Sequence, residues 1–113
     1  MTKQKKTPDQ IKRTAYTRKA EAKLEEAKGA LAVVKAKIKG AVADGQIEAI
    51  ELLQKAEAQA DSRLEKVQRR LTRLKAAGDD SWEELKDGTE SAWEDLSASI
   101  KKIARKLSNE RKS

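Results

Sequence analysis

The stretch that decides the fold is Gly40-Ala-Val-Ala-Asp-Gly-Gln46, or GAVADGQ in one-letter code. It interrupts a long segment rich in Ala, Lys and Glu, and its Asp-Gly pair favours a turn. A glycine inside a helix costs only about 1 kcal/mol, so one continuous helix is the alternative to a turn. The apolar residues on the two sides of GAVADGQ favour the turn.

On each side of the Asp44-Gly45 pair, apolar residues recur at alternating intervals of four and three. Such spacing places them along one side of a helix. The first set is Ala20, Leu24, Ala27, Leu31, Val34, Ile38 and Ala41. The second set is Ile50, Leu53, Ala60, Leu64, Val67, Leu71 and Leu74, with Glu57 in the same series. Steps of seven from Ile38 reach Leu52 and miss the second set, so the register breaks between them.

We therefore predict an all-α protein in which residues 8–77 form an antiparallel helical hairpin, a coiled coil with its break near residues 40–46. Thr7 as N-cap and Pro8 at the first helical position predict where the hairpin begins. Residues 1–7 are expected to be a basic disordered segment. The hairpin seam is predicted to consist of Leu24, Leu31, Val34, Ile38, Ile50, Leu53, Leu64, Val67, Leu71 and Leu74.

A third, amphipathic helix is predicted over residues 81–107, with a frayed tail at 108–113. Gly78 suits the left-handed position after the second helix, and Ser81 with Glu84 forms a capping box for the third. The phrases Ser81-Trp-Glu-Glu-Leu85 and Ala92-Trp-Glu-Asp-Leu96 are eleven residues apart, about three turns, so both tryptophans are expected on one face. That face is Trp82, Leu85, Trp93, Leu96, Ile100, Ile103 and Leu107.

The apolar face of the third helix has three interpretations. It packs on the hairpin, it packs against another subunit, or it lies in a membrane interface where tryptophan and flanking cations are favoured. Gly88 interrupts the helix, and we expect it to allow a close approach of another backbone or a mild bend.

Charge favours packing of the third helix beside the first. Residues 1–43 carry twelve Lys and Arg against four Asp and Glu, a net +8, whereas residues 79–95 carry one Lys against eight acids, a net −7. Attraction between the two segments, within one chain or between neighbouring chains, would set the orientation and make assembly sensitive to salt.

The basic N-terminal region is a candidate contact for polyanions. Lysine and arginine side chains neutralise phosphates without regard to base sequence. The alternative is a solvated, charged tail. The candidate residues are Lys3, Lys5, Lys6, Lys12, Arg13, Arg18 and Lys19.

Composition limits the remaining classes. The 113 residues suffice for one small domain, and 40% of them are charged. There is no cysteine and no histidine, and no segment is apolar enough to cross a bilayer. We find no phosphate-binding glycine loop, nucleophile motif or metal-ligand spacing. We therefore predict a cytoplasmic protein with no enzymatic activity, cofactor, metal or small-molecule substrate.

The third helix resembles the C-terminal signature of a family of small bacterial coiled-coil proteins associated with stress responses. The motif is W-x-x-L-K-x-G followed by A-W-x-x-L, and its eleven-residue step is similar to apolipoprotein-type repeats. The resemblance implies helical hairpins and oligomers. The matching residues are Trp82, Leu85, Lys86, Gly88, Ala92, Trp93 and Leu96.

The sequence thus predicts a self-associating helical scaffold or stress-associated interaction protein that forms homo-oligomers. An amphipathic helix that binds anionic membranes or storage-granule surfaces is the first alternative. Non-specific nucleic-acid binding through the basic N-terminal region is the second.

Overall fold

A computed structural model describes residues 8–45 and 50–112, which form three α-helices and no strand. They are α1 (Pro8–Ala43), α2 (Ile50–Lys75) and α3 (Trp82–Lys112). The predicted disordered segment 1–7 lies outside the described residues. The helix α3 continues past the end expected at residue 107, because no glycine or proline interrupts residues 108–112.

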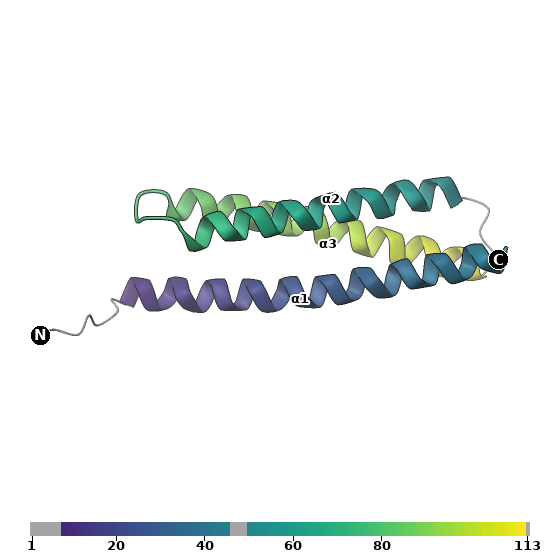
Figure 1. Cartoon of the computed structure of the whole chain (residues 1–113), viewed down its shortest axis with the longest axis horizontal. Helices are drawn as coiled ribbons and strands as arrows, with labels where there is room; N and C mark the ends of the chain where they lie inside the picture. Colours follow the sequence, from purple (N-terminus) through teal and green to yellow (C-terminus); the bar gives the residue numbers. More distant parts are fainter. Residues whose placement is uncertain (1–7, 46–49, 113) are drawn as a thin grey trace, which may run out of the picture.

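The three helices lie side by side in an elongated bundle. The helices α1 and α2 run in opposite directions, and α3 returns beside them in the direction of α1 (Figure 1). The bundle measures 67 × 21 × 17 Å. The pair α2 and α3 packs most extensively, whereas α1 and α3 share the fewest contacts. Within the described ranges, no helix combines the length and the apolarity needed to span a membrane.

The first turn depends on Gly45. The amide of Asp44 donates to the carbonyl of Gly40 at 3.0 Å, and the amide of Gly45 donates to that of Val42 at 3.1 Å. Gly45 has a φ of 65°, a left-handed conformation in which a side chain would be strained. This cap ends α1, so the chain does not continue as one helix into α2.

The turn between α2 and α3 differs from our prediction. The amides of Ala76 and Ala77 bond to carbonyls three residues earlier, which tightens the end of α2. Gly78 does not have the positive φ of a left-handed cap, so that prediction is wrong. The carbonyl of Ser81 accepts the amide of Leu85 at 3.0 Å, as expected of the residue that caps α3.

The core consists of two apolar clusters along the bundle. One lies toward the end of α1 and contains Leu31, Val34, Ile38, Ala41, Leu53, Ala60, Ile103 and Leu107. The other lies nearer the start of α1 and contains Leu24, Ala27, Val67, Leu71, Leu74, Trp82, Ala92 and Leu96. Of the predicted hairpin seam, Ile50 and Leu64 are half-buried at the margins of the clusters and the other eight residues are buried in them. Both clusters draw residues from all three helices, so α3 completes the core that the hairpin begins.

Candidate functional site

The predicted apolar face of α3 packs largely within its own chain. Trp82, Leu96, Ile103 and Leu107 are buried in the core. Leu85, Trp93 and Ile100 are half-buried at its edge. The interpretation in which the face packs on the hairpin therefore describes this structure.

The buried stripe of α3 nevertheless differs from the predicted one. Thr89, Ala92 and Ser99 are buried and were not predicted. A step of seven residues turns a helix back by about 20°, whereas a step of eleven turns it forward by a similar angle. The core follows the steps of seven from Trp82, so Trp93 lies at the edge of the stripe.

Trp93 faces a groove between α1 and α3. The groove has a volume of about 330 Å³ and is floored by α2. We call it the Trp93 groove. It is lined by Tyr16, Lys19, Ala20, Lys23, Val67, Leu71, Thr89, Glu90, Trp93 and Glu94.

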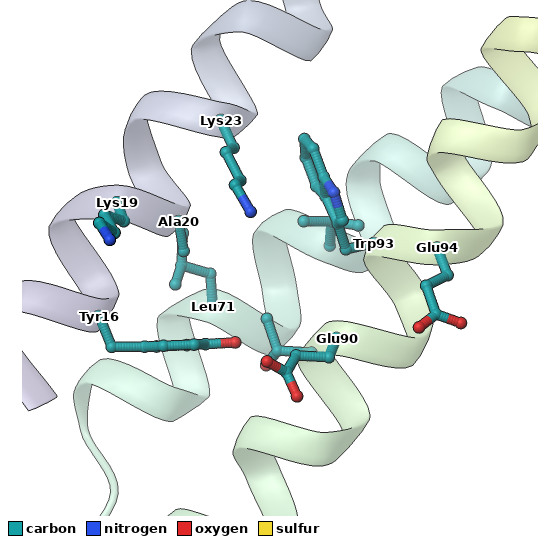
Figure 2. A pocket seen from close by; sticks show the side chains of 10 residues that line it. Tyr16, Lys19, Ala20, Lys23, Leu71, Glu90, Trp93 and Glu94 are labelled. Atoms are coloured by element: carbon teal, nitrogen blue, oxygen red, sulfur yellow. The ribbon is translucent and has the colours of Figure 1, made fainter.

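The side chains of the Trp93 groove come together from all three helices. Figure 2 shows Tyr16 extending from α1 toward Glu90 on α3, and Lys23 pointing from α1 toward the space beside Trp93. Leu71 of α2 also lines the groove and lies between Tyr16 and Lys23 in this view (Figure 2). The groove is therefore apolar at its floor and at Trp93, and charged at its two rims.

Tyr16 crosses the groove as a neutral phenol. Burial raises the pKa of Tyr16 to about 12, and the charges of Glu90 and Asp87 and a hydrogen bond to Glu90 act in the same direction. The phenol donates this hydrogen bond and the carboxylate accepts it. Tyr16 thereby links α1 to α3 at one end of the groove.

The two rims carry opposite charges at matching spacing. Lys19 and Lys23 lie one turn apart on α1, and Glu90 and Glu94 lie one turn apart on α3. Within the described part of the chain, Lys19, Lys23 and Glu94 form no ion pair. These three charges are available to a partner.

An aromatic cluster fixes α1 against the start of α3. The ring of Tyr16 meets that of Trp82 edge to face, with centroids 6.0 Å apart. Arg13 lies 5.2 Å from the Trp82 centroid and pairs with Asp79 at 2.6 Å. The ammonium of Lys86 lies 5.2 Å from the Tyr16 centroid. Trp82 is therefore a structural anchor, in contrast to Trp93.

Ion pairs link α1 to the rest of the bundle, whereas α2 and α3 are joined mainly by the packing of apolar side chains. Besides Arg13, two residues of α1 reach across the bundle. Lys35 pairs with Asp61 at 2.7 Å, and Glu21 pairs with Lys75 at 3.0 Å. The hydrogen bond to Asp61 raises the pKa of Lys35.

Two arginines of α2 lie against small residues of α3. Arg63 donates a hydrogen bond to Ser99. The guanidinium of Arg70 lies so close to Gly88 that a Cβ there would be 2.7 Å from its Nη1. A close approach at Gly88 was expected, but it is made by a side chain and not by a backbone.

Only some of the predicted polyanion contacts fall within the described residues. Lys3, Lys5 and Lys6 lie outside those residues. Lys12, Arg18 and Lys19 are exposed on α1. Arg13 is engaged with Asp79 and Trp82.

Sequence reasoning identified Trp93 and Lys19 but not the groove. Tyr16, Lys23, Glu90 and Glu94 were missed as site residues, because they become neighbours only when α1 and α3 align in parallel. The opposite net charges of residues 1–43 and 79–95 were the available signal. The described residues contain no group of His, Cys, Asp and Glu that could hold a metal.

Comparison with known proteins finds no matching family model and no significant match among curated proteins or solved structures. The resemblance of the α3 motif to stress-associated coiled-coil proteins therefore stays a prediction.

Proposed function

We propose that the protein is a non-enzymatic, self-associating helical scaffold, and that the Trp93 groove is its contact surface. The single observation that carries this proposal is a half-buried tryptophan in a groove with charged rims. Tryptophan is enriched among the residues that dominate binding energy at interfaces, particularly when partner contacts complete its burial. Other large exposed apolar residues, such as Val33 and Leu52, line no part of this groove.

The proposal includes finer features of the architecture and role. We propose that α1 and α2 wind around each other as an antiparallel coiled coil. In support, the buried residues of α1 from Leu24 to Ala41 recur at intervals of three and four, and those of α2 recur at intervals of seven, four and three. The resemblance of the α3 motif to stress-associated bacterial coiled-coil proteins supports a role in a stress response. As part of the same proposal, we place the protein in the bacterial cytoplasm.

Self-association is tested by sedimentation over a range of protein concentrations. Trp93→Ala should raise the dissociation constant roughly 30-fold or more, the effect of losing about 2 kcal/mol at an interface hot spot. Leu52→Ala is the matched control, because it removes a large side chain that is 56% exposed and lies outside the groove. This control should associate like the wild type.

A wild-type protein that stays monomeric at every concentration would contradict the proposal. So would equal weakening by Trp93→Ala and Leu52→Ala, because it would show no preference for the groove. Circular dichroism of both variants serves as the control that tests whether the helices remain folded.

Binding to anionic lipid is the alternative from the sequence, and it would require the bundle to open. The apolar side chains of α3 that would enter a membrane interface are largely packed against α1 and α2. Tryptophan emission that shifts to the blue on adding anionic vesicles would favour this alternative over the scaffold.

A further inference from the structure

We infer that the Trp93 groove receives the same groove of a second copy, with the two chains parallel and related by a two-fold axis along the bundle. This inference rests on the proposed self-association and adds its geometry. It follows from the positions of the lysines and glutamates on the two rims.

A two-fold axis parallel to the helices exchanges the rims. It brings α1 of one copy opposite α3 of the other. Each residue then lies at the same height along the bundle as the equivalent residue of the other copy. Lys23 then faces Glu94 of the partner subunit, and Glu94 faces Lys23 of the partner subunit. The two copies of Trp93 meet at the same height along the bundle.

The antiparallel arrangement gives the opposite result. A two-fold axis across the bundle would bring α1 against α1 and α3 against α3. Lysine would then face lysine and glutamate would face glutamate, and such like-charge contacts are unfavourable. The separation of charge between the two rims therefore selects the parallel dimer.

The spacing of the charges supports this pairing. Lys19 and Lys23 are separated by about 6 Å along α1, and Glu90 and Glu94 are separated by the same distance along α3. Lys19, Lys23 and Glu94 have no ion-pair partner in the described residues of their own chain. A second copy supplies the complementary charges.

The test is a charge swap. The double variant Lys23→Glu with Glu94→Lys keeps the net charge of the chain and exchanges the signs of the two rims. It should form a dimer with itself as the wild type does. In a mixture with the wild type, native mass spectrometry should detect mixed dimers at roughly a tenth of their statistical share, because like charges then meet at both rims.

The single variants complete the test. Lys23→Glu alone and Glu94→Lys alone should each raise the dissociation constant roughly tenfold, and the defect should diminish at high salt. Melting curves of each variant separate a loss of pairing from a loss of folding.

The possible results distinguish this inference from the proposed function. Dimers that mix freely, or mixed dimers in excess of the statistical share, would overturn the parallel arrangement while self-association stands. A wild-type protein that is monomeric throughout would overturn both.

Discussion

At the scale of single residues, the two tryptophans have different environments despite their nearly repeated sequence phrases. Trp82 is 8% exposed and is enclosed by Tyr16, Arg13 and the core. Trp93 is half-buried and forms part of the wall of the groove. The difference arises because the core follows a seven-residue step, which neither phrase alone reveals.

Tyr16 provides a pH-dependent prediction at this scale. It is the only tyrosine in the chain, so the absorbance of tyrosinate reports on it alone. The folded protein should titrate near the raised pKa of about 12 and the urea-unfolded protein near 10.0. A midpoint near 10.0 in the folded protein would show that the phenol is not buried against Glu90.

The same shift affects stability at high pH. Below pH 10.0, Tyr16 is neutral in both states, and its contribution to stability is fully present. Above that pH the unfolded chain ionises first, so the free energy of unfolding should fall as the pH rises toward about 12. The raised pKa of Lys35 also makes the free energy of unfolding fall at high pH. Because Lys35 is retained in Tyr16→Phe, the shallower fall expected of that variant measures the contribution of Tyr16 alone.

At the scale of elements, α3 combines two roles on neighbouring positions. Leu96 is fully buried and joins α3 to the core, whereas Trp93 faces the groove. A combined substitution of both residues would therefore mix loss of folding with loss of contact. The two residues must be changed separately.

Single alanine substitutions should separate stability from association. Leu96→Ala should lower the free energy of unfolding by about 2 to 5 kcal/mol, because it leaves a cavity at a fully buried position. Trp93→Ala should lower it less in dilute, monomeric protein, since part of the indole is already in water. Urea unfolding at low protein concentration measures both, and equal losses would contradict the assignment of Trp93 to the groove.

How far sequence predicts this fold is clearest from particular elements. The start of α3 follows from Ser81, and the end of α1 follows from Asp44-Gly45, because caps and turns are local chemistry. The place of Gly88 against Arg70 depends on neighbouring helices. The groove also depends on them, since its rims come from α1 and α3, which are far apart in the chain.

At the scale of the whole molecule, α1 is the helix most dependent on charge. Each of the three ion pairs described between different helices or turns has one partner on α1. Exposed pairs contribute about 0.2 to 1 kcal/mol each and are screened by salt. The contacts between α2 and α3 are more extensive and include a shared apolar core.

Salt should therefore loosen α1 selectively. Raising the ionic strength from about 0.1 to about 1 M shortens the screening distance from about 10 to about 3 Å. Amide hydrogen exchange should accelerate in α1 more than in α2 and α3. Asp61→Asn removes the ion pair with Lys35 and should reduce the salt-dependent increase. Uniform acceleration in all three helices would contradict this prediction.

The odd number of helices described has a mechanical consequence. The start of α1 and the end of α3 lie at opposite ends of a body 67 Å long (Figure 1). Two cargoes joined to these positions would be held apart at a nearly fixed separation, as by a rigid spacer. An even number of helices would bring the same cargoes to one end. The bundle thus has the geometry of a molecular ruler.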